Sequence, residues 1–402
     1  MTSPAFRLLA TCPETGARAG ELATPHGAVP TPVFAPVGSQ GTVKTLTPAD
    51  LKELKAALIL ANTYHLYLRP GIEVIARLGG LHRFMAWDGP ILTDSGGYQL
   101  FSLATLSKVS DDGVLFRSHI DGSEHFLTPE KVIECQEKLG ADIIMVLDQP
   151  LPYTEDIRQV QAAMERTQRW AERCRSSHHR ADQAPSTGSG QALYGIVQGG
   201  TFPELRRQSA AGLTALDFPG YAIGGLGLGE RKEQTLAIVA ETVSYLPEDR
   251  PRYLMGIGSP EDVIEAIARG VDMFDCALPT RVARNGAFFT RDGRQNIRNA
   301  VYKDREAPLD STCGCYTCRT FSAAYVHHLF KCEELLAYRL TTLHNLHFLL
   351  GLVREARDAI VNGTFPSFRK EFISSYRATS EEVRLEQKRR WLAVGRIRNA
   401  GS

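Results

Sequence analysis

Short apolar runs recur along the chain, and each run ends in polar or glycine-rich residues. The seven runs cover residues 56–66, 90–99, 141–150, 192–200, 221–230, 252–262 and 271–281. Within each run the apolar residues are contiguous rather than alternating, which is typical of strands buried on both faces of a parallel sheet. We therefore expect one buried strand in each run.

Helical patterns lie between these runs. Residues 128–140 begin with Thr128 as an N-cap and Pro129 at the first helical position, and they end at Gly140. Residues 259–270 repeat this pattern. The alternation of buried strand, polar loop and helix favours a parallel α/β barrel over a doubly wound sheet. The Ser-, Gly- and Pro-rich segment 175–191 is predicted to be an exposed loop.

Composition narrows the class of protein. The 402 residues are 43% hydrophobic, which is enough for a large core, and the 46 basic and 45 acidic residues nearly cancel. This balance argues against a general polyanion binder but permits a local basic patch, with Arg281, Arg284 and segment 388–398 as candidates. The chain opens without a signal-peptide pattern, and no apolar run approaches the roughly 18 residues that span a bilayer. We expect a cytoplasmic protein that makes no contact with a membrane.

A cysteine cluster near the C-terminal end predicts a metal site. Cys313, Cys315 and Cys318 lie within six residues of one another, in a chain with only 8 cysteines. Thiolate and imidazole donors suit tetrahedral Zn²⁺, and four protein ligands would make the site structural rather than catalytic. Spacing alone leaves the fourth ligand open among His327, His328, Cys332, His344 and His347.

Polar residues and glycines close the predicted strands. They are Asp94, Ser95, Tyr98, Asp148, Gln149, Gln198, Gly199, Gly200, Gly224, Gly225, Met255, Gly256, Asp275 and Cys276. In a barrel these positions meet on the C-terminal face, where barrel enzymes carry out their chemistry. Each aspartate by itself could cap a loop, but three at strand ends indicate acid/base or nucleophilic catalysis. The H-E-x-x-H and G-x-S-x-G motifs are absent, and GGLGLGE does not fit a dinucleotide fingerprint.

Longer motifs resemble those of the bacterial tRNA-guanine transglycosylases, the queuine tRNA-ribosyltransferase family. They include NTYHLYLRPG, TDSGGYQLFSL, YGIVQGG, AIGGLGLGE, YLMGIGSPED, DMFDCALPTR, CGCYTC and HNLHF, and they cover nearly the whole chain. The resemblance implies an irregular (β/α)₈ barrel with a zinc-binding insertion. It implies a catalytic barrel over 1–300, and a zinc-binding subdomain with C-terminal helices over 301–402 that includes the closing barrel helix.

The resemblance also implies a reaction. Members of this family exchange the wobble guanine of tRNA anticodons for 7-aminomethyl-7-deazaguanine, the queuosine precursor, by double displacement through a covalent enzyme–RNA intermediate. By position, Asp275 resembles the nucleophile and Asp94 the general acid/base. The match singles out His344 as the fourth ligand of one structural zinc per chain, and it implies a homodimer.

Binding residues carry over in the same way. Asp148 resembles the acceptor for guanine N1–H and its amino group, beside Ser95, while Gln198 and the Gly225 N–H resemble the donors to its carbonyl. Tyr98 and Met255 resemble the residues that sandwich the ring, and the Leu226 carbonyl resembles the acceptor for the aminomethyl group. The implied RNA contacts are Gly256, Ile257, Gly258, Ser259, Pro260, Glu261, Asp262, Thr280, Arg281, Val282, Ala283 and Arg284.

One departure bears on the base pocket. Where the family usually has Asp-Glu-Cys, this chain has Asp148-Gln149-Pro150, which changes one wall of the pocket. Leu228 stands where eukaryotic relatives have glycine, which favours a small incoming base. Two alternatives are a non-catalytic RNA-binding subunit on the same scaffold and an ordinary barrel glycosidase. Retention of Asp94 and Asp275 speaks against the first, and Arg281 and Arg284 have no use in the second.

Overall fold

The computed structural model describes residues 6–102, 107–182 and 190–386. Its strands are β1 (Phe6–Thr11), β2 (Arg18–Thr24), β3 (Gly27–Thr31), β4 (Val33–Pro36), β5 (Ile59–Asn62), β6 (Ile91–Asp94), β7 (Ser107–Val109), β8 (Val114–Arg117), β9 (Glu124–Leu127), β10 (Ile143–Met145), β11 (Ala192–Val197), β12 (Tyr221–Ile223), β13 (Arg252–Leu254), β14 (Met273–Cys276), β15 (Ala287–Thr290) and β16 (Gly293–Asn296). Its helices are α1 (Pro48–Glu53), α2 (Thr63–Leu68), α3 (Ile72–Arg77), α4 (Gly80–Met85), α5 (Gly97–Ser102), α6 (Pro129–Leu139), α7 (Ile157–Asp182), α8 (Pro203–Ala215), α9 (Lys232–Ser244), α10 (Pro260–Ile267), α11 (Leu278–Arg284), the 3₁₀ helix η1 (Ala300–Tyr302), α12 (Tyr316–Thr320), α13 (Ala323–Lys331), α14 (Leu335–Val361) and α15 (Phe365–Ser375).

Eight parallel strands form the centre of the molecule, in the order β4-β5-β6-β10-β11-β12-β13-β14. The first and last strands of this series pair with each other, with Val33 opposite Met273. At the remaining junction, Val37 bridges to Leu60 just beyond the end of β4. With this single bridge between the ends of the sheet, the strands form a nearly closed barrel, and the predicted α/β barrel is confirmed.

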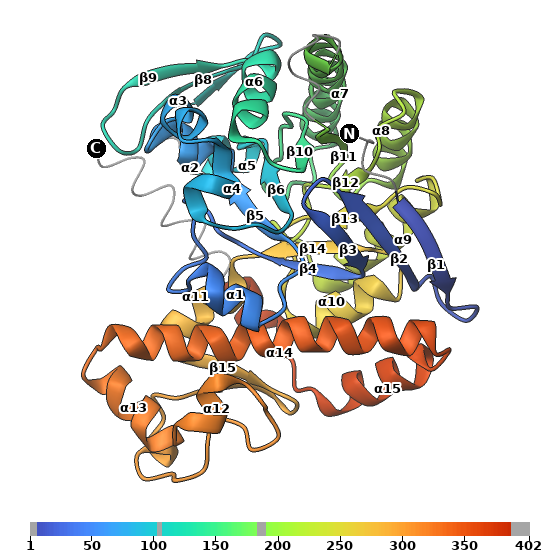
Figure 1. The fold of residues 1–402 in the computed structure, drawn as a ribbon. Helices are drawn as coiled ribbons and strands as arrows, with labels where there is room; N and C mark the ends of the chain where they lie inside the picture. The colour runs from blue at the N-terminus through green and yellow to red at the C-terminus, as the bar shows by residue number, and fades with distance from the viewer. Residues whose placement is uncertain (1–5, 103–106, 183–189, 387–402) are drawn as a thin grey trace.

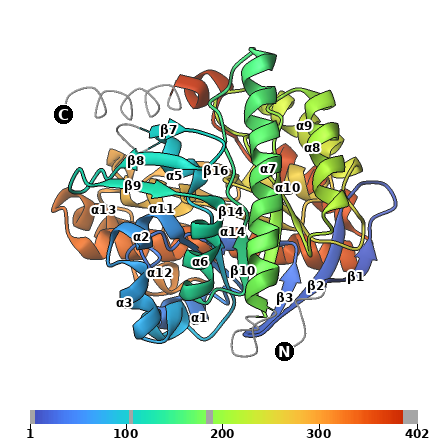
Figure 2. The ribbon, with the colours of Figure 1, turned by 90° about the horizontal axis from the view of Figure 1, so that it is seen from above.

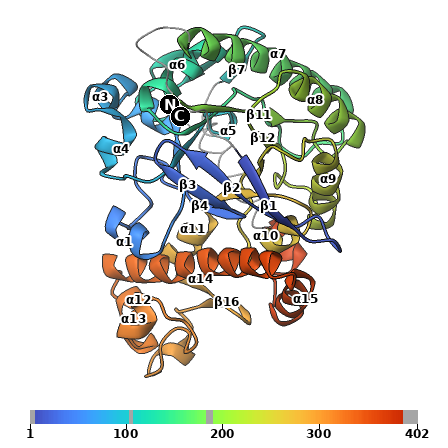
Figure 3. The same ribbon diagram turned by 45° about the vertical axis from the view of Figure 1, so that its right-hand side comes forward.

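Helices cover the outside of the barrel. Figure 3 shows α6, α7, α8 and α9 in an arc around the strands. Helix α7 lies between α6 and α8 and contacts both (Figure 2). Helix α6 begins and ends as predicted, because the Thr128 hydroxyl accepts the Lys131 N–H and Gly140 adopts the left-handed conformation beyond its last turn.

An antiparallel sheet of β1, β2 and β3 lies across one end of the barrel (Figure 3). The Arg18 guanidinium on β2 donates to Asp272, directly before β14, with an Nη2 to Oδ2 distance of 2.6 Å. The turn between β2 and β3 places His26 Nδ1 2.8 Å from Asp142 Oδ1, directly before β10. Since both aspartates precede parallel strands, this sheet covers the N-terminal ends of the barrel strands and leaves the opposite end for the candidate site.

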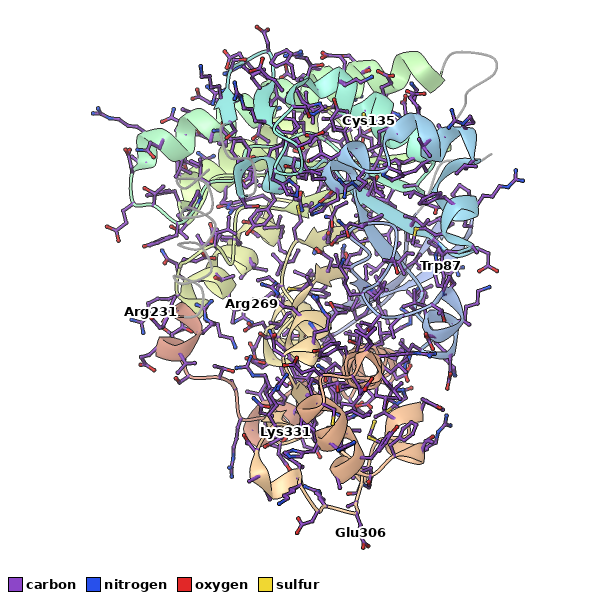
Figure 4. The ribbon with its side chains drawn as sticks, turned by 90° about the vertical axis from the view of Figure 1, so that its left-hand side faces the viewer. Trp87, Cys135, Arg231, Arg269, Glu306 and Lys331 are labelled. Carbon is purple, nitrogen blue, oxygen red and sulfur yellow. The ribbon has the colours of Figure 1, made fainter. Side chains whose placement is uncertain are left out.

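Helix α14 runs along the barrel and separates it from a smaller unit that contains α12, α13 and the β15–β16 hairpin (Figure 1). A second apolar cluster, drawn from residues 288–340, forms the interior of this unit. In Figure 4 Glu306 and Lys331 lie in it, and Cys135 of α6 lies toward the opposite end of the molecule. The domain boundary predicted between residues 300 and 301 stays a prediction.

The structure departs from the sequence-based expectations in two places. Strand β4 was not among the seven predicted runs, because its four residues stand between Pro32 and a terminal Pro36 and are too few for a clear apolar pattern. The exposed loop predicted over 175–191 is wrong for its first part, since α7 continues to Asp182. There His178 is buried, with its Nδ1 2.9 Å from Glu137 Oε1. Among the described residues, no helix is long and apolar enough to cross a membrane.

Candidate active site

One cavity of about 400 Å³ opens at the C-terminal ends of the barrel strands. Most of the residues expected to act on a ligand line it, namely Asp94, Ser95, Tyr98, Asp148, Gly225, Leu226, Met255, Gly256, Asp275 and Arg281. Pro150 and Leu228, the positions of the departure noted above, line it as well. The parallel strand order thus brings together side chains that lie up to 187 positions apart in the sequence, from Asp94 to Arg281.

Asp94 ends β6 and is buried, with 8% of its surface exposed. The Thr63 N–H donates to its Oδ1 at 2.9 Å, and the Asn62 amide donates to its Oδ2. Burial raises the pKa of Asp94 to about 7, and the negative charge of Asp275 acts in the same direction against those hydrogen bonds. A carboxyl group with a pKa near neutrality can both give and accept a proton at physiological pH.

Asp275 lies in β14 on another side of the cavity. Its Oδ1 accepts the Tyr253 hydroxyl at 2.6 Å and the Gly256 N–H at 2.9 Å. Burial raises the pKa of Asp275, while these two hydrogen bonds favour the ionised form. Both hydrogen bonds from described residues end on the same oxygen, so the carboxylate is held firmly at one end only.

Asp148 lies beyond β10, between two side chains from neighbouring strands. Its Oδ2 accepts the Gln198 amide at 2.7 Å, and its Oδ1 accepts the Ser95 hydroxyl at 3.3 Å. Burial raises the pKa of Asp148 to about 6. Gln198 itself borders a smaller cavity, which shares Gly225 with the main one, and its amide reaches the main cavity through the bond to Asp148.

The loop after β12 forms a further wall of the cavity. Gly225 has a φ of +68°, and a Cβ atom there would lie 2.3 Å from the Gln198 side-chain oxygen, so this close approach requires glycine. Glu230 closes the loop from within, since its buried carboxylate accepts the N–H groups of Gly227 and Leu228. The Glu230 carboxylate therefore holds the peptide groups on both sides of Gly227. One of them is the peptide group that contains the Leu226 carbonyl.

The residues predicted to contact RNA lie at and beneath the rim of the cavity. Arg281 of α11 is exposed and lines the cavity, while Arg284 is half-buried and donates from Nε to the Thr280 carbonyl at 3.2 Å. Thr280 and Ala283 lie on the buried side of α11. In the segment that leads into α10, Gly258 and Pro260 are buried, Gly256 is exposed, and Ile257, Ser259, Glu261 and Asp262 are intermediate.

Charge around these positions is mixed. Lys232 forms ion pairs with both Glu261 and Asp262, at 3.0 Å from a Glu261 oxygen. This lysine offsets two negative charges that would otherwise repel a phosphate backbone. The basic segment 388–398, the other predicted patch, lies outside the described residues.

The predicted metal ligands come together where the smaller unit meets α14. The donor atoms of Cys313, Cys315, Cys318 and His344 all lie within 4.8 Å of one another, so these residues could hold a metal ion. His344 Nδ1 lies 3.3 Å from the Cys318 sulfur, and its Nε2 lies 2.7 Å from the Phe289 carbonyl oxygen. A hydrogen bond from Nε2 to that carbonyl orients Nδ1 as the ligand atom, which is the usual arrangement for a metal-bound histidine.

The other candidates for the fourth ligand have different surroundings. His327 Nδ1 lies 2.6 Å from the Ile297 carbonyl, and His328 lies on an exposed surface beside Cys332. His347 is half-buried one turn of α14 beyond His344, outside the group of donor atoms. The donor set is therefore three sulfurs and one nitrogen, a combination that suits tetrahedral Zn²⁺.

Several cavity residues had no role assigned from the sequence. Asn62 is the last residue of β5 and lines the cavity, and Thr63 follows it directly, so the rule that selected the other strand-end residues also applies to both. His65 lines the cavity, and burial, with the charges of His119 and Lys44, lowers its pKa to about 4. Tyr253 lies inside β13 and carries no local signal, because only the closed barrel brings its hydroxyl to Asp275.

The fold and the site define an α/β-barrel enzyme in which buried carboxylates surround one cavity. The family model for queuine tRNA-ribosyltransferase matches residues 12–378. The chain belongs to the queuine tRNA-ribosyltransferase family, as the resemblance predicted.

Relatives named queuine tRNA-ribosyltransferase are similar over almost their entire length. One from Dehalococcoides mccartyi is 57% identical over 390 residues, which is 97% of each chain. One from Caldanaerobacter subterraneus is 55% identical over 368 residues, which is 92% of this chain and 96% of the relative. One from Moorella thermoacetica is 55% identical over 376 residues, which is 94% of this chain and 99% of the relative.

Proposed function

We propose that this chain exchanges the wobble guanine of tRNA anticodons for 7-aminomethyl-7-deazaguanine, a step of queuosine biosynthesis. Membership of the queuine tRNA-ribosyltransferase family supports a tRNA-guanine transglycosylase activity. The observation that carries the proposal is the placement of Asp94 and Asp275 at one cavity, where burial, together with the charge of Asp275, raises the pKa of Asp94. Exchange of a base without cleavage of the RNA chain needs such a pair, one group for the sugar and one for the bases.

The proposed reaction is a double displacement. An oxygen of Asp275 attacks C1′ of the wobble nucleotide, the bond from C1′ to guanine N9 breaks, and Asp94 gives a proton to the departing base. The incoming base then returns its N9 proton to Asp94, N9 attacks C1′, and the bond to Asp275 breaks. Since Asp275 Oδ1 accepts hydrogen bonds from Tyr253 and Gly256, Oδ2 is the oxygen proposed to attack. Two inversions restore the configuration at C1′.

Base recognition is proposed for the residues around Asp148. Its carboxylate would accept from guanine N1–H and the amino group, and the Gly225 N–H and Gln198 amide would donate to the carbonyl. Gln198 donates one amide hydrogen to Asp148 at 2.7 Å in this structure, and its –NH2 group carries a second hydrogen that can donate to the carbonyl of a bound base. Adenine would leave these groups unpaired, at a cost of about 1–3 kcal/mol for each. Tyr98 and Met255 line the same cavity and are proposed to sandwich the ring.

Further binding roles follow from position at the cavity. The Leu226 carbonyl is proposed to accept the aminomethyl group of the incoming base, and Ser95 supports Asp148. Arg281, Arg284 and segment 256–262 are proposed to contact bases and phosphates beside the wobble position, with the base itself swung out of the anticodon stack. A homodimer stays a prediction from the family resemblance.

We also propose that Cys313, Cys315, Cys318 and His344 hold one structural Zn²⁺. A closed set of four protein ligands leaves no position for a substrate, and none of the four donors lines the cavity. When bound, the ion would tie the segment around Cys315 to α14. The Phe289 carbonyl supports the site by orienting the His344 ring.

The test is incorporation of labelled guanine into unmodified tRNA by the purified protein. We expect label in tRNA and its displacement by 7-aminomethyl-7-deazaguanine. Binding of tRNA without incorporation would instead support the second candidate, a non-catalytic subunit. The arginines at the rim and the metal ligands are the features that support a non-catalytic subunit. Such a subunit would have no need for the raised pKa values of Asp94 and Asp148.

A further inference from the structure

Arg206 is a fully buried cation in α8 that has no role in the proposed chemistry. Its Nε donates to the Gly200 carbonyl at 2.8 Å, and its Nη1 donates to the Val197 carbonyl at 2.9 Å. Its Nη2 is buried without a hydrogen-bond partner among the described residues. Burial lowers the pKa of Arg206 to about 9, and the charge of Glu230 opposes that shift.

Burial of a guanidinium costs free energy of desolvation, which an apolar side chain would avoid. We therefore expect the hydrogen bonds of Arg206 to have a role beyond packing. The two carbonyls that it binds belong to the residues on either side of Gln198 and Gly199. Three residues further along α8, the Ser209 hydroxyl accepts the Gln198 N–H at 3.1 Å. One helix thus fixes segment 197–200 through three hydrogen bonds.

The segment also packs closely against the helix. Gly199 has a φ of +132°, and a Cβ atom there would lie 2.8 Å from the Arg206 backbone nitrogen. This contact holds the backbone of the segment at a fixed distance from α8. Because Gln198 points away toward Asp148 and borders Gly225, the position of segment 197–200 sets where the Gln198 amide lies in the base site.

A second loop is coupled to the same cation. Glu230 is the carboxylate whose charge favours the ionised form of Arg206, and it accepts the N–H groups of Gly227 and Leu228. Arg206 therefore binds the segment that carries Gln198 directly, and its charge interacts with the carboxylate that holds the loop of Gly225 and Leu226.

We propose that Arg206 is a positioning residue for recognition of the base. Its hydrogen bonds to the Val197 and Gly200 carbonyls hold the Gln198 side chain in place beside Asp148 and Gly225. The inference rests on the proposed function, in which these groups read the Watson–Crick edge and the carbonyl of a guanine-type base. Arg206 itself touches no substrate.

The test is calorimetric titration of the protein with 7-aminomethyl-7-deazaguanine. We would compare wild type with Arg206→Met, which keeps the length of the side chain without its donors, and with Arg206→Lys, which keeps the charge without the two-point grip. Ser209→Ala removes the third hydrogen bond to the segment. Arg207→Met is the matched control, because Arg207 is the next residue of α8 but is exposed and pairs with Glu204 on the helix surface.

We expect the dissociation constant to rise about tenfold or more in Arg206→Met, with smaller rises in Arg206→Lys and Ser209→Ala and none in Arg207→Met. The binding stoichiometry should stay at the wild-type value, because positioning changes affinity in every folded molecule. A merely structural role would instead lower the stoichiometry and leave the dissociation constant unchanged, which would overturn the proposal. If Arg206→Met fails to fold, Arg206→Lys and Ser209→Ala decide the question in the same way.

Failure of this inference is separable from failure of the proposed function. Wild-type protein that does not bind the base would contradict the function itself. Wild-type protein that binds the base, together with variants of Arg206 and Ser209 that bind it equally well, would contradict only the role of Arg206.

Discussion

Asp94 carries the proton transfers of the proposed reaction, and its environment sets the pH at which it can do so. Burial and the charge of Asp275 raise its pKa to about 7, and hydrogen bonds from Asn62 and Thr63 hold it below the value that burial alone would give. Asp148 has fewer neighbouring charges and a pKa of about 6. The two carboxyl groups thus differ in pKa. The higher pKa suits Asp94 to proton transfer, and the lower one suits Asp148 to recognition of the base as a carboxylate.

Asn62→Ala should move the pH dependence of the reaction to higher pH. The variant removes a hydrogen bond that favours the ionised carboxylate, so the pKa of Asp94 should rise above its present value of about 7. The limb of the kcat/KM profile that reports the pKa of Asp94 should therefore move to higher pH. This holds whether Asp94 limits the rate as an acid or as a base. A profile that shifts to lower pH, or stays in place while overall activity is retained, would contradict this account of Asp94.

Base selection should divide between Asp148 and Pro150. Asp148→Asn presents an amide where two donors need a carboxylate, so it should lower kcat/KM for guanine and for 7-aminomethyl-7-deazaguanine alike, by about tenfold or more. Pro150→Cys changes a cavity wall that has no polar side chain, so it should alter the ratio of the two kcat/KM values and leave the chemistry largely intact. The opposite outcome, a ratio moved by Asp148→Asn alone, would reverse this division.

At the scale of elements, local signals located the barrel strands and missed what depends on distant partners. Contiguous apolar runs marked every barrel strand except β4, and the Thr128 cap marked α6. Segment 175–191 was predicted to be a loop because it is rich in Ser, Gly and Pro, yet α7 continues as far as Asp182 and Glu137 holds His178. Tertiary contacts of this kind leave no trace in local composition.

The metal site belongs to the scale of elements, because it joins α12 and the turn before it to α14. Cys318→Ser should lower bound zinc from one equivalent per chain and destabilise the smaller unit, since metal binding at such a site is coupled to local folding. Cys332→Ser is the matched control, because Cys332 is exposed and outside the donor group. Metal analysis and proteolysis of the smaller unit would report both effects. Zinc content unchanged in Cys318→Ser, or absent from the wild type grown with added zinc, would contradict the site.

At the scale of the whole molecule, the barrel makes the site by bringing the ends of separate strands together. The sequence was sufficient to propose Asp94, Asp148 and Asp275 as neighbours, because parallel strands end at one face. It could not indicate Tyr253 or Arg206, whose roles depend on contacts across β13, β14 and α8. The clamp of Arg18 on Asp272 joins residues 254 positions apart and was equally invisible.

The most direct test of the central claim is a search for the covalent intermediate. Radiolabelled tRNA would be mixed with the protein without an incoming base, quenched in denaturant, and run on a denaturing gel. We expect a labelled protein–RNA adduct for wild type and for Cys276→Ser, which removes the neighbouring thiol at the cavity. We expect none for Asp275→Ala, because C1′ then has no nucleophile. An adduct that persists in folded Asp275→Ala, or that maps to a peptide without Asp275, would contradict the assignment.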